Sequence, residues 1–456
     1  MHTIARVNTL RPEHYIVLNP HLSYKPFASC PEKSNIYLFD FISSSGPKTD
    51  GPHVFTNSDD FETHIATTSK PHTRIVSICS ENSMRPLGVT EQAMRRLINT
   101  YGIDATLLDL VVSFGDKPKS SDSGQGAMTV RQQEDGSYDM QYLFAYADQS
   151  AAHGDIPWTI RQTCVFHRYN PAGSGNLWIF LHARPRSKMQ QQIEAEITSQ
   201  YAGVSKSWYS MHLLVLSAYI GNWRWCIRSV GEQIEKTIDI ALTLDLSKSN
   251  NDKDGLIRLL TPQYLGDKLL PISSRLQVAL ETICKLEEMN TFFQSRALAT
   301  DDDARRFAGE MAYYKTSIEG YLKSVEVLEG KVKGISDLLA VALSLKGQTV
   351  ANQINDKMLQ LTTEAFDDNA TVRVVTIVTL IYLPASFVST LLGMNLFDFG
   401  DSAGGFTISK QFWIFIVAAV PLTMLTLGTW YIITKRQVRL RQAKLQQKRN
   451  EAGEEC

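Results

Sequence analysis

Hydroxyl and amide side chains recur at intervals of three and four residues through an apolar segment near the C-terminal end. Steps of three and four keep them within one arc of about 100° on an α-helix. The stripe comprises Asn369, Val372, Thr376, Thr379, Leu383, Ser386 and Thr390. Several such helices around one axis would present hydroxyl oxygens to a hydrated cation. Leu383 would then form an apolar ring that can gate the path by dewetting.

The same stripe has a second interpretation. Serine and threonine often bond back to their own helix or line a contact between helices. Pro384 stands beside Leu383, frees a backbone carbonyl and can bend the helix. Because two helices per chain cannot enclose a path, the pore interpretation requires an oligomer with one stripe per subunit.

Two apolar segments are long enough to cross a membrane. Residues 371–394 carry one charge, Arg373, and residues 412–434 carry none. Each has about the 20 residues that a helix needs to span a hydrocarbon core of roughly 30 Å. A pair of buried core helices is the alternative. The sequence predicts two transmembrane helices at the C-terminal end, joined by an outer loop over residues 395–411.

Charges beside these segments predict their orientation. Basic residues follow the second segment at Lys435, Arg436, Arg439, Arg441, Lys444, Lys448 and Arg449. Such residues mark the cytoplasmic side of a membrane. Asp398 and Asp401 outnumber Lys410 in the connector, which we therefore place outside. Residues 435–456 form a basic cytoplasmic tail that can also contact lipid headgroups. Both termini are then cytoplasmic, and with no targeting signal seen, the plasma membrane is the predicted location.

Composition argues against several other functions. The 456 residues carry a net charge of −1, with 20% charged residues, so no basic face predicts a nucleic-acid partner. The six cysteines form no C-x-x-C pair, which suits a reduced compartment. H-E-x-x-H, G-x-S-x-G and phosphate-loop motifs are absent. We therefore predict a protein that is not an enzyme and has no cofactor.

The first apolar segment ends in Gly393-Met394-Asn395. At this position, before a short acidic loop and a second span, the tripeptide resembles the GMN motif of the CorA magnesium-transporter family. Three other stretches resemble the fungal branch of CorA-like proteins. They are Tyr382-Leu383-Pro384-Ala385-Ser386-Phe387, Trp158-Thr159-Ile160-Arg161-Gln162-Thr163 and Asn222-Trp223-Arg224. The specific part of the resemblance covers residues 369–434, and the upstream part is looser.

The resemblance implies a homopentamer whose central pore is lined by the first span. It implies that Asn395 forms a selectivity ring and binds the hydrated cation through its waters, with Gly393 and Met394 shaping the turn. Magnesium dehydrates reluctantly and prefers six oxygen ligands, which suits a ring of neutral amides. Asp398 and Asp401 would add negative potential at the outer mouth. Mg²⁺, or another divalent cation, is the predicted substrate.

Two departures from the family pattern leave the ion open. Leu392 stands where many members carry an aromatic residue, and the following loop lacks the usual Met-Pro-Glu run. Zinc, nickel and cobalt remain alternatives, because the zinc-transporting ZntB branch shares the architecture. A membrane-anchored cytosolic sensor or scaffold with a relic pore is the second alternative.

Upstream of the membrane we predict two cytosolic regions. Residues 1–187 form an α/β domain, with strands at 36–41, 74–78, 163–169 and 177–182, a helix at 90–101 and a surface loop at 117–133. Residues 188–370 form a helical stalk region. Met211–Ile220 is a buried soluble helix, because the apolar run is too short to span a membrane.

One stalk helix is expected from about Ile335 through Met394. Its apolar face comprises Leu343, Gly347, Val350, Ile354, Met358, Leu361 and Ala365, which recur at three or four residues. We expect this face to contact neighbouring subunits; an ordinary helical bundle is the alternative. Asp301, Asp302 and Asp303 read as a solvated helix start. Asp367 and Asp368 would concentrate cations at the inner mouth.

Overall fold

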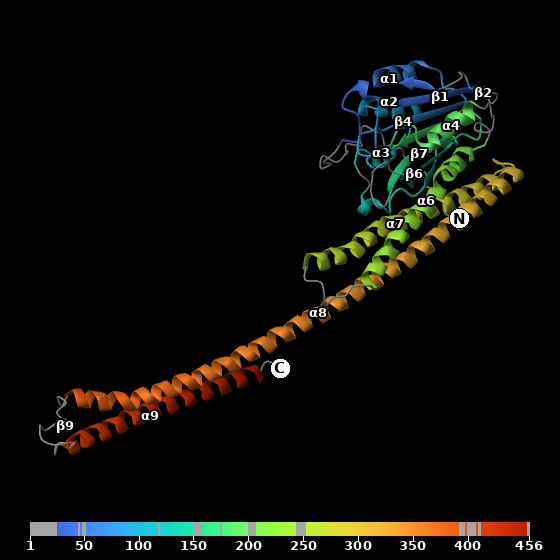
Figure 1. Ribbon diagram of the computed structural model, residues 1–456. Coiled ribbons are helices and arrows are strands. Elements are labelled where there is room, and N and C mark those ends of the chain that lie inside the picture. The colour runs from blue at the N-terminus through green and yellow to red at the C-terminus, as the bar shows by residue number, and fades with distance from the viewer. Residues whose placement is uncertain are drawn as a thin grey trace. The chain divides into compact units, whose positions relative to one another are not determined.

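The structure is a computed structural model that describes most of the chain (Figure 1). The described ranges are residues 25–43, 46–47, 52–116, 119–149, 157–173, 176–198, 207–242, 252–391, 397–398, 407–408 and 412–453. The chain divides into two compact units, Met1–Leu343 and Ser344–Cys456. Each unit is described by itself below.

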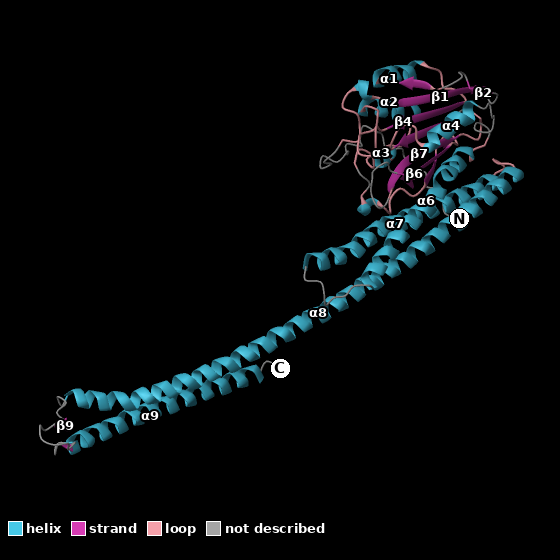
Figure 2. Ribbon diagram, viewed as in Figure 1, coloured by secondary structure: helices cyan, strands magenta, loops and turns pink. Residues whose placement is uncertain are grey.

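An eight-stranded sheet forms the centre of the first unit (Figure 2). Its strands are β1 (Ile36–Ser43), β2 (Gly46–Pro47), β3 (His53–Phe55), β4 (Thr73–Cys79), β5 (Thr129–Gln132), β6 (Tyr138–Gln149), β7 (Trp158–Tyr169) and β8 (Asn176–His182). The order is β2-β1-β4-β8-β7-β6-β5, and β3 also pairs with β1. β4 and β8 are parallel, in register from Thr73↔Asn176 to Cys79↔His182, and the other pairs are antiparallel.

Apolar side chains cover both faces of this sheet. Successive residues of a strand point to opposite faces, so Val76 and Ile78 join one core cluster while Ile75 joins the other. The first cluster lies under α1 (Ser58–Thr67), α2 (Glu91–Tyr101) and α3 (Leu107–Val111). The Thr90 hydroxyl caps α2 by accepting a hydrogen bond from the Ala93 amide. The predicted α/β domain is confirmed, as are its four strands and its helix.

Long helices continue the second core cluster. They are α4 (Lys188–Thr198), α6 (Ser210–Leu242), α7 (Asp252–Ser295) and α8 (Asp301–Leu391). Two short 3₁₀ helices, η2 (Pro31–Lys33) and η3 (Ser120–Asp122), complete the helices of this unit's described part. Fully buried Trp223 of α6, Leu276 of α7 and Phe307 of α8 share one cluster with the sheet. The predicted buried helix at Met211–Ile220 is the first part of α6.

The stalk helix is longer than the sequence predicted. α8 begins at Asp301 rather than near Ile335, because Thr300 and Asp303 form a reciprocal cap at its start. The Asp303 amide donates to Thr300 Oγ1 at 3.2 Å, and the Thr300 hydroxyl donates to Asp303 Oδ2 at 2.7 Å. The prediction of a helix start at Asp301 to Asp303 is confirmed. As far as Leu339, α8 contributes buried residues to the core of a helical bundle.

The prediction of a surface loop over residues 117–133 is wrong for its last part. Thr129–Gln132 forms β5, which pairs antiparallel with β6 at the sheet edge. An edge strand needs only one buried face, and this short Thr-Val-Arg-Gln run carries a weak pattern. Strand β6 and helix α1 were not predicted from the sequence either.

A buried polar network links the sheet to α6. Tyr142 Oη lies 3.0 Å from His212 Nδ1, and His212 Nε2 lies 3.2 Å from His167 Nδ1. The His167 ring stacks on Trp178 with centroids 3.5 Å apart. Burial lowers the pKa of His212 to about 3. Burial, and secondly the nearby His212 ring, lower the pKa of His167 well below its usual value. Both rings are therefore neutral in the folded protein near pH 7.

These histidines predict an acid-sensitive fold. The unfolded chain takes up protons near pH 6.5 and the folded chain does not, so stability is full above that pH and falls toward pH 3. Burial also lowers the pKa of His182 to about 3. At pH 5 each such ring should cost about 2 kcal/mol of unfolding free energy. Urea unfolding of the full chain between pH 7 and 5, followed by tryptophan fluorescence, measures the slope.

The matched variant is His212→Gln, which removes one proton-binding group. Its stability should depend less steeply on pH than that of the parent chain. Equal slopes for the two proteins would contradict the assignment.

Candidate functional site

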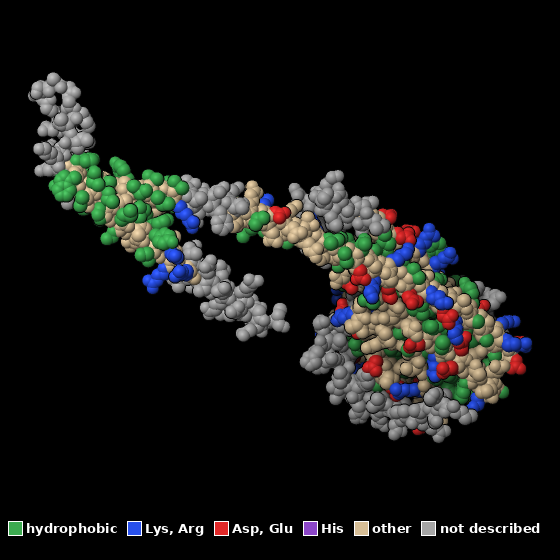
Figure 3. Space-filling model, turned by 90° about the horizontal axis from the view of Figure 1, so that it is seen from below, with side chains coloured by type: hydrophobic (Ala, Val, Ile, Leu, Met, Phe, Trp, Pro, Cys, Tyr) green, Lys and Arg blue, Asp and Glu red, His purple; other side chains and the backbone are tan. Residues whose placement is uncertain are grey.

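Two exposed apolar helices form the second unit's hairpin. Val372–Thr390 of α8 has a mean hydropathy of 1.8 and is 11% buried; Phe412–Arg436 of α9 (Phe412–Gly453) has a mean hydropathy of 1.9 and is 6% buried. Core helices of a soluble protein would be mostly covered. Figure 3 shows hydrophobic side chains gathered over both helices, with Lys and Arg at one end of this band. These two helices match the predicted spans and suggest an integral membrane protein.

One face of each helix packs within the hairpin. α9 runs back along α8 in Figures 1 and 3. In the described part of the two segments, Pro384, Val388 and Ala419 are the buried side chains. Val388 and Ala419 are each 6% exposed. Small residues such as Ala419 are common where membrane helices pack together.

The polar stripe lies mainly outside this packed face. Val372 is 60% exposed and Leu383 is 66% exposed. Thr379, Ser386 and Thr390 are exposed as well, while Thr376 is half-buried. The side chain of Asn369 lies outside the described residues. Within the single chain, the stripe from Val372 to Thr390 is thus mostly left uncovered by α9.

The threonine hydroxyls of the stripe bond back to their own helix. Thr376 Oγ1 donates to the Val372 carbonyl at 2.7 Å, and Thr379 Oγ1 donates to the Val375 carbonyl at 2.7 Å. Thr390 Oγ1 donates to the Ser386 carbonyl at 2.9 Å. Such bonds are expected if the stripe serves only its own helix, but each of them uses only the hydroxyl hydrogen. The oxygen lone pairs remain available to a cation or its waters.

Gly393, Met394, Asn395 and Asp401 lie outside the described residues. The backbone of Asp398 lies in β9 (Phe397–Asp398), which pairs antiparallel with β10 (Thr407–Ile408). The side chain of Asp398 is also outside the described part. Among the described residues no group of three or more His, Cys, Asp or Glu side chains could hold a metal ion.

The apolar stalk face is uncovered in the second unit. Val350, Ile354, Met358 and Leu361 are 44%, 56%, 61% and 61% exposed. The side chains of Ala365, Asp367 and Asp368 lie outside the described residues. A helix with a continuous exposed apolar face needs a partner in water.

Comparison with known proteins relates part of the chain to a family. Residues 23–242 match the family model described as CorA-like transporters. These residues, just under half of the chain, are similar to the CorA-like family. The match covers the α/β domain and α6, whereas the sequence resemblance was most specific over residues 369–434. The similarity supports divalent-cation transport in general terms and is consistent with a self-associating membrane protein.

Two solved structures resemble the chain weakly. The structure of the full-length CmaX protein has a TM-score of 0.43 at 11% identity, covering 90% of this chain and 99% of its own. The cytoplasmic domain of ZntB from Vibrio parahaemolyticus has a TM-score of 0.35 at 12% identity, covering 67% and 98%. No curated protein matches the sequence.

The packed face of the hairpin predicts a position-dependent effect of size. Ala419→Phe places a large ring where the side chain is 6% exposed, and overpacking should destabilise the hairpin by about 1–3 kcal/mol. Val420→Phe is the control, because Val420 is the next residue along the helix and its side chain is 51% exposed. Thermal unfolding of the full chain in detergent compares them. A larger loss in the control would show that the packed face is assigned wrongly.

Proposed function

We propose that this CorA-like chain transports divalent cations, chiefly Mg²⁺, through a central pore lined by α8. The observation that carries the proposal is the stripe. Its hydroxyls stay mostly uncovered by α9, while Pro384 and Val388 of the same helix are buried. A run of hydroxyl side chains along one face of a membrane helix suits a water-filled path between several helices. Such a path requires more than one chain.

The proposed assembly is a homopentamer. The exposed stalk face supports it, because Ile354, Met358 and Leu361 would be covered by neighbouring copies. In that arrangement Leu383 from each copy forms an apolar constriction. Asn369 would line the inner end of the pore, with Asp367 and Asp368 attracting cations there.

At the outer mouth we propose a ring of Asn395 side chains, with Gly393 and Met394 shaping the turn. Neutral amide oxygens can bind the waters of a hydrated Mg²⁺ without trapping the ion, whereas a carboxylate ring would release it more slowly. Asp398 and Asp401 would raise the local cation concentration. The proposed location is the plasma membrane with both termini cytoplasmic, where 100 mV supplies roughly 4.6 kcal/mol per divalent cation.

Two alternatives are retained. The same architecture could transport Zn²⁺, Co²⁺ or Ni²⁺, as the departures at Leu392 and the outer loop suggest. A membrane-anchored sensor or scaffold would keep the cytosolic domain and carry no flux. The size of the oligomer in detergent tests the scaffold alternative. A monomer or dimer could not enclose the proposed pore and would favour the scaffold.

The filter proposal predicts the effect of Asn395→Ala. Loss of the amide ring should reduce Mg²⁺ flux into reconstituted vesicles at least tenfold, or abolish discrimination against Ca²⁺. Asn99→Ala is the control, because Asn99 is exposed on α2 in the α/β domain. Flux and selectivity that are unchanged by Asn395→Ala would remove the proposed filter.

The gate proposal predicts the effect of Leu383→Ala. A wider, wetter constriction should raise the basal flux severalfold, because dewetting depends on apolar side chains that narrow the path. Leu425→Ala is a matched control, since both leucines are 66% exposed but Leu425 lies on α9. Vesicle flux with equal purified protein measures both. An equal rise in the two variants would mean that Leu383 has no special role.

A further inference from the structure

The segment after β4 folds back onto the end of that strand. The Gly88 amide donates to the Cys79 carbonyl at 3.1 Å, and the Asn35 amide donates to the Gly88 carbonyl at 2.9 Å. A Cβ at Gly88 would lie 2.6 Å from the Cys79 carbonyl oxygen and 2.8 Å from the Asn35 nitrogen. Only glycine allows this close approach, so the backbone here is held in one arrangement.

A cleft of about 730 Å³ opens beside this segment. Cys79, the last residue of β4, lines it together with Pro185, which follows β8. The carboxyl ends of the parallel pair β4 and β8 therefore meet at the cleft. Open α/β sheets bind small molecules outside the carboxyl ends of their parallel strands. The volume also falls within the usual range for small-molecule sites.

The charge of the cleft favours an anion. Lys33 and Arg85 line it and are exposed, and neither has an ion pair among the described residues. Glu81 is the carboxylate among the described lining residues. Pro86 and Pro185, which are partly exposed, add apolar surface. The site thus combines two available cations with an apolar wall.

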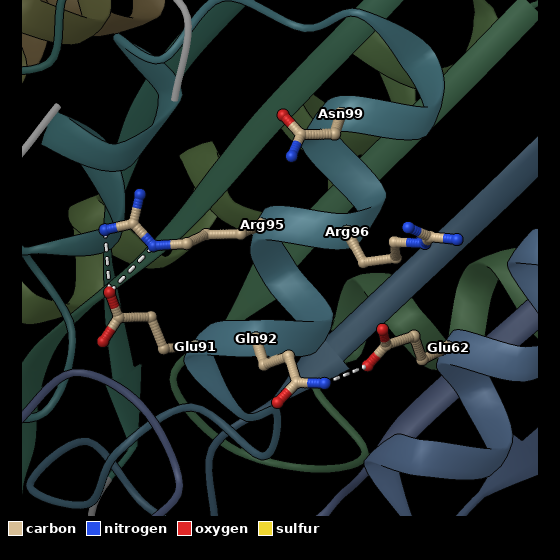
Figure 4. Close-up of a pocket in the computed structure, with 6 residues that line it drawn as sticks. All are labelled: Glu62, Glu91, Gln92, Arg95, Arg96 and Asn99. Carbon is tan, nitrogen blue, oxygen red and sulfur yellow. Dashed lines mark hydrogen bonds and ion pairs between the residues drawn. The ribbon is translucent and has the colours of Figure 1, made fainter. Parts of the chain in front are cut away.

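A second groove, between α1 and α2, has a different character (Figure 4). Arg95 forms an ion pair with Glu91 at 2.7 Å, and Gln92 Nε2 donates to Glu62 Oε2 at 3.2 Å. The polar groups of that groove largely satisfy one another. Arg96 lines this second groove and is exposed, so it serves as a control for removing a surface cation away from the proposed cleft.

Backbone strain lies next to the cleft. Arg186, directly after Pro185, has φ of 51°, which is unfavourable for a residue with a side chain. The Arg186 amide donates to Gln190 Oε1 at 3.2 Å, and the same oxygen accepts from the Cys79 thiol at 3.2 Å. Gln190 thus connects the strained turn to the end of β4. Strain of this kind concentrates at ligand-binding sites.

We propose that this cleft binds a small organic phosphate of nucleotide size. Lys33 and Arg85 contact the phosphate, since ammonium and guanidinium groups are the usual phosphate donors. The base or other apolar part lies against Pro86 and Pro185. The ligand is independent of the transported cation, so the site would let the α/β domain respond to a metabolite.

Calorimetric titration of the full chain in detergent and EDTA tests this directly. AMP and ADP are the probes, and the metal-free buffer removes any contribution from the transported cation. We expect saturable binding of both, with inorganic phosphate at least tenfold weaker because it lacks an apolar part. Absence of saturable binding by AMP and ADP overturns the proposal. Adenosine binding as tightly as AMP overturns it as well.

Substitutions locate the site. Lys33→Gln with Arg85→Gln should weaken AMP binding at least tenfold, and Arg96→Gln in the other groove should leave it unchanged. Glu81→Gln should tighten it about threefold, because it removes a like charge from the anion's surroundings. A gain in affinity cannot come from misfolding. Unaltered affinity in the double variant, or weaker binding by Glu81→Gln, overturns the assignment.

Discussion

The apolar surface of the hairpin is the constraint that governs this protein. Val372–Thr390 and Phe412–Arg436 leave about nine-tenths of their length unburied by the chain itself. Exposing such an apolar surface to water costs free energy, so lipid or other copies of the chain must cover it. A helix satisfies its own backbone hydrogen bonds, which is why this surface can exist in hydrocarbon. The basic residues at one end of the hairpin then find the aqueous interface.

Helix α8 meets three different surroundings along its length. Phe307 and Met311 lie in the core of the first unit. The side chains of Ile354 and Met358 are exposed, and Val388 is buried in the hairpin. A single helix of 91 residues carries all three.

The transport interpretation gains from where the stripe lies. Had Thr379 and Ser386 packed against α9, the hydroxyls would have served the hairpin alone. The back-bonded hydrogens of Thr376, Thr379 and Thr390 do not weaken the argument, since Thr423 on α9 bonds back in the same way. Most of the stripe stays uncovered by α9 in one chain, as most of the span does. The family match reinforces the general function but comes from residues 23–242, on the other unit.

Local patterns sufficed for much of the architecture. Uninterrupted apolar runs predicted both spans, and strongly apolar strands such as β4 and β8 were recognisable because they are buried on both faces. The helix start at Asp301 was read correctly, but its connection to the stalk was missed. Residues 301–339 bury only one side in a bundle, so their sequence carries charge on the other side and a weak apolar signal.

The sequence by itself determined the membrane hairpin and the stripe, because these depend on periods of three to four residues and on run length. Tertiary structure alone decided which face of α8 packs against α9, and it alone brought Lys33, Arg85 and Pro185 to one cleft. The reason is distance along the chain: residues more than 100 positions apart meet through the parallel pairing of β4 and β8. No local pattern records that pairing.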